Sequence, residues 1–445
     1  MAIRLRLANL GQTSTLDLWS GTLQVRGGGW QTRRNGARVI ETFNLVGGGS
    51  DATLITAVNT FEDLLDLVEK FHTDPLRNES IWLEANATSE TARRALLYDG
   101  ELTPAMLANL SPLLGRDGAY YTAALTRHAA WEKVTAETAS TTNVSALGGT
   151  WALGDEGGTL NGRIARLSVE GRSGGGGPLH RFWVGIRPLY EGTSTFASKW
   201  ECESGTNATD ATDTADANAS GGTMVRVDFA TVATLTKRFH MGVTTFVSTS
   251  KHAVGRYLIL ARAKVTAGTV ALQMRSGFSG GENFAPHKMC FLSNTTYELI
   301  ELGEVQFPPM GYRSLLQNDE MLEQMQLQFW AERISGAGNL DVDCLVLMPS
   351  EHMFYVSGDR VQYYVDGNET QLLTFENDEH LAVNMQGIFS GLVPYANLDY
   401  APTRWEYPVG GGLLVFAGQR NGEQILTDAV DMDYSMYPRW RHYAG

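Results

Sequence analysis

The stretch Gly255-Arg-Tyr-Leu-Ile-Leu-Ala-Arg-Ala-Lys-Val265 decides the fold class of this chain. Apolar side chains occupy every second position from Tyr257 onwards, whereas Arg256, Arg262 and Lys264 fall between them. Successive side chains of a β-strand point to opposite faces. The alternation therefore predicts a strand with one buried face and one solvent-exposed face.

Similar alternating runs follow this strand at short intervals. Gly, Ser, Asn and Pro residues separate them, and the runs cover residues 270–274, 297–305, 325–333 and 342–347. Short strands bounded by turn residues are typical of an antiparallel β-sandwich or jelly roll. Sandwiches of this kind mostly bind or assemble, although a fold alone does not establish a function.

The composition agrees with a folded, mainly-β protein of several domains. At 445 residues the chain is too long for one core and predicts about two to four domains. Its hydrophobic fraction of 43% and aromatic fraction of 10% are those of a globular protein. The 48 glycines and the low charged fraction of 19% favour many tight turns and short strands.

Charge and hydropathy exclude several classes of function. The net charge is −14 and no block of Lys or Arg occurs, so sequence-specific or general nucleic-acid binding is not expected. No apolar run is long enough to span a membrane, and the alternating N-terminus does not resemble a signal peptide. We therefore expect a protein made in the cytoplasm. Cys202, Cys290 and Cys344 lack metal spacing and are predicted to be small buried residues.

The first 135 residues predict a small sheet, sandwich or split barrel packed on one helix. The period of the apolar residues changes from two to 3.6 over residues 60–71, which indicates an amphipathic helix. Asn59 or Thr60 is its expected N-cap, and Pro75 is expected to end it. Gly27-Gly-Gly29 is predicted to form a turn. Strands are expected on either side of the helix, at residues 3–7, 39–46, 80–84, 95–98 and 119–127.

Two polar segments are predicted to be irregular. Residues 135–149 are rich in Thr, Ala and Ser and are expected to link two domains. Residues 204–222 lack an apolar pattern and are expected to form a long exposed loop. Asp210, Asp213 and Asp216 recur there at every third position. They could line a calcium loop, but a solvated acidic loop fits the spacing better.

No catalytic motif is present in the sequence. Asp341 and Asp343 are predicted to share the outward face of a strand, at a separation that fits a glycosidase carboxylate pair only loosely. No further acid or base accompanies them. The sequence therefore predicts no catalytic, cofactor-binding or metal-binding residue, and a protein that is not an enzyme.

Two tryptophans are the candidate contact residues. Trp200 stands beside polar loops, and Trp330 shares a predicted strand face with Gln326, Gln328 and Glu332. Exposed aromatic rings of this kind stack on sugars in carbohydrate-binding sandwiches. The alternative, which we favour, is that they are covered by a neighbouring domain or subunit.

Four short motifs carry a resemblance to a known family. They are the N-terminal sheet with its helix at 60–71, Tyr121-Thr-Ala-Ala-Leu-Thr-Arg-His-Ala-Ala-Trp131, the stretch from Leu153-Gly-Asp155 to Ile164, and the closing Tyr437-Pro-Arg-Trp440. In arrangement and in these motifs the chain resembles structural proteins of tailed bacteriophages, in particular distal-tail and tail-tube-like proteins.

The resemblance implies an organisation in three domains. Residues 1–135 would form a tail-tube-like, ring-forming domain. Residues 136–192 and 354–445 would form one discontinuous β-sandwich, into which residues 193–353 insert a second, jelly-roll sandwich. Sandwiches in series are the alternative.

The implied function is that of a structural virion protein at the distal tail, baseplate or tube. It would form a homo-oligomeric ring, a hexamer by family analogy, around the DNA channel, and would contact other tail proteins. An acidic channel lining would repel the passing genome. The alternative from another class is a carbohydrate-binding module protein that recognises host surface glycans.

Overall fold

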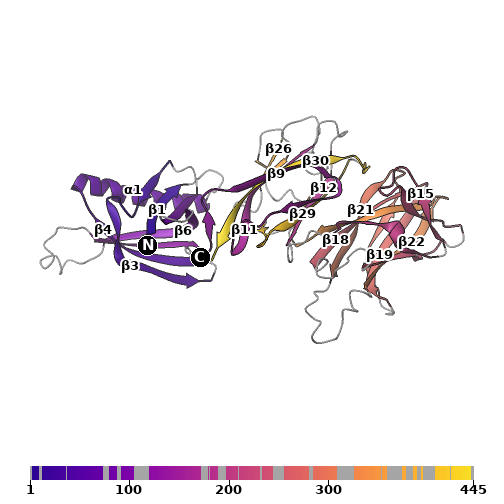
Figure 1. Ribbon diagram of the computed structural model, residues 1–445, viewed down its shortest axis with the longest axis horizontal. Coiled ribbons are helices and arrows are strands. Elements are labelled where there is room, and N and C mark those ends of the chain that lie inside the picture. Colours follow the sequence, from indigo (N-terminus) through magenta and orange to yellow (C-terminus); the bar gives the residue numbers. More distant parts are fainter. Residues whose placement is uncertain are drawn as a thin grey trace.

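The computed structural model describes most of the chain as antiparallel sheets with one long α-helix. The described residues are 3–9, 13–36, 38–73, 80–87, 92–104, 120–171, 179, 181–188, 197–208, 210–230, 233–243, 255–279, 284–307, 325–351, 353–357, 373–376, 384–387, 392–393, 406–420 and 422–441. Three parts lie in a row: an N-terminal unit, a middle sandwich and a distal sandwich (Figure 1). The predicted mainly-β class is confirmed.

Two sheets that share one strand enclose the core of the N-terminal unit. The strand orders are β2-β1-β5-β6 and β3-β4-β7-β6. Strand β6 pairs with β5 near its beginning and with β7 along its second half, so the sheet folds over at β6. The bounds are β1 Ile3–Asn9, β2 Thr15–Asp17, β3 Leu23–Asn35, β4 Arg38–Gly47, β5 Ile81–Ala87, β6 Arg93–Pro104, β7 Tyr120–His128 and β8 Trp131–Lys133.

The amphipathic helix α1 covers this core, but it is longer than predicted. It spans Asp51–Thr73 and begins after Ser50, whose hydroxyl accepts a hydrogen bond from the Thr53 amide at 3.4 Å. The N-cap predicted at Asn59 or Thr60 is wrong. Thr60 fits inside the helix because its hydroxyl donates to the Thr56 carbonyl one turn earlier, at 2.8 Å. Pro75 lies outside the described residues.

The helix buries one apolar face against both halves of the sheet. The buried residues recur at helical spacing: Ala57, Phe61, Leu64, Val68 and Phe71. Gly27-Gly-Gly29 does not form the predicted turn. It lies within strand β3, where the pairing with β4 shifts register between Val25 and Trp30. Glycines in a strand interior commonly mark such an irregularity.

The middle sandwich combines strands from two distant parts of the sequence. One sheet contains β9 Glu137–Ser145, β11 Leu160–Gly171 and β30 Ala429–Trp440, with the short strands β25 Leu373–Glu376, β26 Asn384–Gly387, β27 Leu392–Val393 and β28 Glu406–Tyr407. The other has the order β10-β29-β12-β24, with bounds β10 Leu147–Leu153, β29 Gly412–Gln419, β12 Arg181–Pro188 and β24 Met353–Ser357. The domain boundaries proposed from the sequence stay a prediction.

The polar segment predicted as a link is instead part of this sandwich. Residues 137–145 form β9, which pairs with β30, and residues 147–153 form β10. The sequence is misleading because β9 is rich in Thr and most of it is exposed, so it carries no apolar alternation. Threonine nevertheless favours strands, since its branched side chain fits a pleated surface.

The distal sandwich consists of two sheets. One has the order β15-β16-β23-β18-β21, with β13 also paired to β23, and the other the order β14-β17-β22-β19-β20. The bounds are β13 Lys199–Glu201, β14 Thr206–Asn207, β15 Ala211–Ala215, β16 Thr223–Val227, β17 Thr236–Gly242, β18 Gly255–Val265, β19 Thr269–Phe278, β20 Ala285–Leu292, β21 Glu298–Phe307, β22 Met325–Ser335 and β23 Leu340–Pro349, with a short 3-10 helix, η1, at Cys202–Ser204.

The alternation that predicts β18 is confirmed on one face only. Tyr257, Ile259 and the three alternate residues that follow are buried in the sandwich core. Arg262, predicted to face solvent, is 2% exposed. The predicted exposed loop at 204–222 is also wrong, because β14 and β15 lie within it and β15 pairs with β16.

The sheets of the middle and distal sandwiches stack on one another. In β29, Leu414 and Phe416 join the core of the middle sandwich, whereas Val415 and Ala417 pack against the distal sandwich. Every residue of β23 is buried as well. Close approach of these layers needs a glycine at 185, where a Cβ atom would lie 2.6 Å from the Pro349 carbonyl oxygen.

Among the described residues, no helix combines the length and the apolar character needed to cross a lipid bilayer.

Candidate functional site

Trp200 cannot serve as the predicted exposed contact residue. Its side chain is fully buried and stacks on Phe307 at a centroid distance of 5.9 Å. Its indole N–H donates to the Ala197 carbonyl at 2.9 Å. The prediction of exposure rests on the polar residues that follow Trp200 in the sequence, but the position of Trp200 is set by the strand that carries it. Strand β13 pairs with the buried strand β23.

Trp330 lies on the outward face of the distal sandwich. It is half-buried on β22, and its inward neighbours Leu327 and Phe329 are in the core. The guanidinium of Arg275 lies over the indole, 3.8 Å from the ring centroid. The indole N–H donates to the Gln328 side chain at 3.2 Å. A cation held over a ring in this way fixes the orientation of the ring.

The strands beside Trp330 add polar and apolar groups to the same row. Lys237 of β17 and Gln273 of β19 are its direct cross-strand neighbours. Phe291, 66% exposed, lies on β20 one residue pair further along. We call this surface the Trp330 platform, and it comprises Lys237, Gln273, Arg275, Phe291, Gln328 and Trp330.

The three aspartates at 210, 213 and 216 do not converge on a shared cation site. Asp210 pairs with Arg238 at 3.1 Å, and Asp213 accepts a hydrogen bond from the side chain of Asn207 at 2.7 Å. Asp216 pairs with Lys264 at 2.6 Å. Each carboxylate thus serves a different partner of the distal sandwich.

Asp341 and Asp343 do not lie on an outward strand face, which corrects the sequence prediction. Both are completely buried. Asp341 accepts two hydrogen bonds from Arg226, at 2.7 and 2.8 Å, and Asp343 pairs with Arg262 at 2.5 Å. Both carboxylates are buried and bonded to arginines, so a substrate could not reach them, and we assign them as structural ion pairs.

Glu201, Asp343 and Cys344 come close enough together to be tested as a metal site. Their ligand atoms lie within 4.8 Å of one another. However, Asp343 already binds Arg262 and the Ser220 amide, and Glu201 pairs with Lys199 at 2.8 Å. Burial holds the pKa of the Cys344 thiol well above its usual value, which disfavours the thiolate that a metal requires. The cluster fits an ion-pair network better than a metal site.

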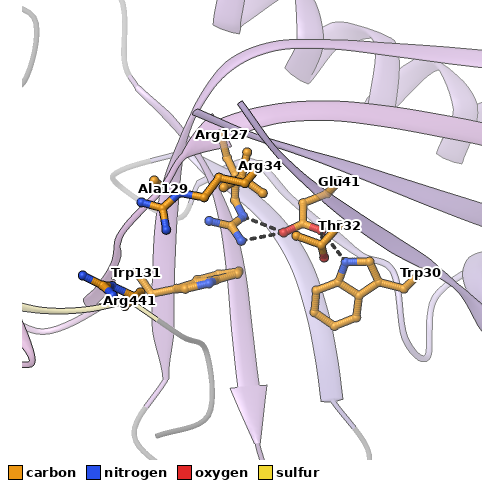
Figure 2. Close-up of a pocket in the computed structure, with 9 residues that line it drawn as sticks. Trp30, Thr32, Arg34, Glu41, Arg127, Ala129, Trp131 and Arg441 are labelled. Carbon is orange, nitrogen blue, oxygen red and sulfur yellow. Dashed lines mark hydrogen bonds and ion pairs between the residues drawn. The ribbon is translucent and has the colours of Figure 1, made fainter. Parts of the chain in front are cut away.

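A cavity of about 490 Å³ opens in the N-terminal unit, at a place that sequence reasoning missed. Its lining comes from β3, β4, β7 and β8, together with a residue near the end of the described chain (Figure 2). We call it the arginine pocket, and it is lined by Trp30, Thr32, Arg34, Val39, Glu41, Arg127, Ala129, Trp131 and Arg441.

A buried ion pair forms the floor of the arginine pocket. Glu41 is completely buried, and one of its oxygens accepts two hydrogen bonds from Arg127, at 2.9 and 2.5 Å. The other oxygen accepts from the Trp30 indole at 2.6 Å and from the Thr32 hydroxyl at 2.5 Å. Four donors therefore compensate the single charge of Glu41.

Positive charge prevails in the pocket. Burial lowers the pKa of Arg127 below its ordinary value while Glu41 opposes this effect, and a guanidinium remains protonated in proteins. Arg34 and Arg441 are both exposed, and Glu41 is the only acidic residue of the lining. The described lining thus carries three cationic side chains against one carboxylate.

The sequence does hold a signal for this pocket. Glu41 alternates with Val39 and Phe43 and so falls on the apolar face of β4. A carboxylate on a core-facing position requires a buried partner. The sequence alone does not reveal that the partner is Arg127, 86 residues away.

Comparison with known proteins gives no relative from which residues could be transferred. No protein-family model matches the chain, and no curated protein matches it.

The Glu41→Gln variant should destabilise the N-terminal unit by about 3–5 kcal/mol, because it leaves the buried Arg127 without a counter-charge. Hydrogen–deuterium exchange of β3, β4 and β7 measures this as a lower opening free energy. The matched control is Glu101→Gln on the exposed end of β6, expected to change stability by less than about 0.5 kcal/mol. Equal amide protection of these strands in the two variants would contradict the assignment of Glu41 as the counter-charge of Arg127.

The distal sandwich should lose stability as the pH falls from about 4 to about 2. Burial alone would raise the pKa of Asp216, but hydrogen bonds from Lys264, the Asn218 amide and Tyr297 lower it from 3.8 to about 2. A carboxyl with a depressed folded-state pKa stabilises the fold above its unfolded pKa and ceases to do so on protonation. Thermal unfolding should therefore show that the midpoint temperature falls less between about pH 4 and pH 2 for Asp216→Asn than for the exposed control Asp213→Asn.

Proposed function

We propose that this chain is a structural subunit of a bacteriophage tail or a phage-like particle. In this proposal the N-terminal unit assembles into a ring around the channel, and the sandwiches project from it. The sequence resemblance motivates the proposal, and three features of the fold support it.

The observation that carries the proposal is the open edge of β3. This strand has 13 residues and pairs only with β4 among the described strands. Its beginning is tied to the chain before it, because the Val25 amide donates to the Leu18 carbonyl at 2.8 Å. Beyond Val25, the backbone N–H and C=O groups of β3 that point away from β4 have no strand partner within the described residues. Such an edge is a template for pairing with another chain.

A second feature is the firm connection between the N-terminal unit and the middle sandwich. Strand β30 pairs with β9 and β11 of the sandwich and, at its end, with β8 of the N-terminal unit. At this junction the buried Glu132 pairs with Arg94 at 3.1 Å and lies 3.8 Å from Arg439. A continuous strand and a shared ion cluster would hold the sandwiches in a fixed direction relative to a ring.

The third feature is the extended arrangement of the chain. The three parts lie in a row, with the N-terminal unit at one end and the distal sandwich at the other (Figure 1). A ring built from the N-terminal unit would therefore leave the distal sandwich free to point away from the axis.

The full-length protein should form a closed oligomer with a mass several times that of the monomer. We expect light scattering coupled to size exclusion to show one oligomer of discrete mass. The fraction of protein in this oligomer should increase with protein concentration. Head-to-tail contacts close into rings when the rotation permits. A monomer at every concentration would count against the proposal.

Glycan binding is the second candidate function, and the Trp330 platform is the observation that favours it. The half-buried Trp330 ring, the exposed Phe291 ring and the exposed amine of Lys237 offer the aromatic surface and a hydrogen-bond donor of the kind that sugar recognition uses. The distal position of the sandwich would place this surface away from the ring.

The Trp330→Ala variant should then lose binding on a glycan array. Truncation of a central aromatic contact typically costs about 2 kcal/mol, which weakens binding roughly 30-fold. The matched control is Trp200→Phe, because Trp200 is buried and its replacement should leave glycan binding unchanged. Absence of binding by the wild-type protein, or equal binding by Trp330→Ala, would remove this candidate.

A further inference from the structure

We propose that the arginine pocket of one subunit binds the acidic face of α1 on a second copy of this chain. This inference rests on the proposed ring assembly and names the side chains that would form its contact.

The pocket provides fixed positive charge without a matching acid. The carboxylate of Glu41 is fully engaged by Arg127, Trp30 and Thr32, so it has no capacity to neutralise the pocket further. Within the described part of the chain, the exposed Arg34 donates only to the Gly36 carbonyl, at 3.3 Å. Arg34 and Arg441 are thus placed to receive carboxylates from outside.

The complementary surface is the solvent-exposed side of α1. Glu62, Asp63, Asp66 and Glu69 all lie on it, and none of them takes part in an ion pair within the described residues. Like charges three and four residues apart destabilise a helix by a few tenths of a kcal/mol per pair. A cationic partner would relieve this repulsion.

The two surfaces also match in their apolar parts. Ile55 is 59% exposed and lies seven residues before Glu62, on the same side of α1. The pocket offers the half-buried Trp30 and the buried Trp131 as apolar walls. An exposed isoleucine beside carboxylates fits a pocket that combines tryptophans with arginines.

Their positions on the subunit suit a head-to-tail contact. Helix α1 lies along the upper side of the N-terminal unit, whereas β3, which carries Trp30 and Arg34, lies along its lower side (Figure 1). A contact between two different surfaces is heterologous, and it generates a ring when the rotation closes. The same strand β3 provides the open edge, so the backbone and side-chain contacts would belong to one interface.

A charge-swap experiment on the full-length protein tests this inference. One variant carries Arg34→Glu with Arg441→Glu, a second carries Glu62→Lys with Asp66→Lys, and a third combines all four substitutions. We expect each of the first two to raise the concentration needed for assembly about tenfold or more, and the combined variant to restore assembly, because every pocket then meets a complementary helix.

The matched control is Lys288→Glu with Arg256→Glu, which makes the same charge change at exposed positions of the distal sandwich, away from the proposed contact. Circular dichroism of every variant should equal that of the wild type, so that lost assembly is not lost folding. Assembly of the pocket variant at the wild-type concentration, or no rescue in the combined variant, would overturn the inference and leave the ring proposal standing. A wild-type protein that never assembles would instead overturn both.

Discussion

The buried guanidinium of Arg262 is the interaction on which the arrangement of the sandwiches depends. It donates to Asp343 of β23, to the backbone carbonyl of Asn218, and to both the side-chain and backbone oxygens of Gln424. These partners come from one strand, a turn and the returning C-terminal segment. A buried charge needs all such partners, because any one that is missing leaves a desolvation cost uncompensated. Arg262 thereby fixes where the last part of the chain crosses the distal sandwich.

This constraint explains why the sheet β10-β29-β12-β24 is buried on both faces. Once the segment around Gln424 is held against β18, the preceding strand β29 must run between the two sandwiches. All eight of its residues are buried, and it pairs with both β10 and β12. The stack of sheets thus follows from one ion-pair network and one shared apolar layer. The middle and distal sandwiches are held together as a single structural element.

The sequence predicts the strands well and their surroundings poorly. A period of two shows which residues share a face, as it does for Tyr257 and Ile259, but not what covers the opposite face. For that reason the pattern predicts Arg262 at the surface and leaves Trp200 as a candidate exposed contact, whereas both lie under other parts of the chain. The arginine pocket is not predicted from the sequence for the same reason. Glu41 indicates a buried ion pair, whereas its partner and the cavity above it depend on tertiary contacts.

The distribution of charge connects these buried pairs with the proposed assembly. Each buried pair, such as Glu41 with Arg127 or Asp343 with Arg262, removes one cation and one anion from the surface. Such pairs leave the excess of acidic over basic residues in the sequence, 49 against 35, uncompensated. Copies of such a protein repel one another unless the contact supplies backbone pairing, apolar burial or local positive charge. The open edge of β3 and the arginine pocket offer all three on one side of the N-terminal unit, which is why we place the subunit contact there.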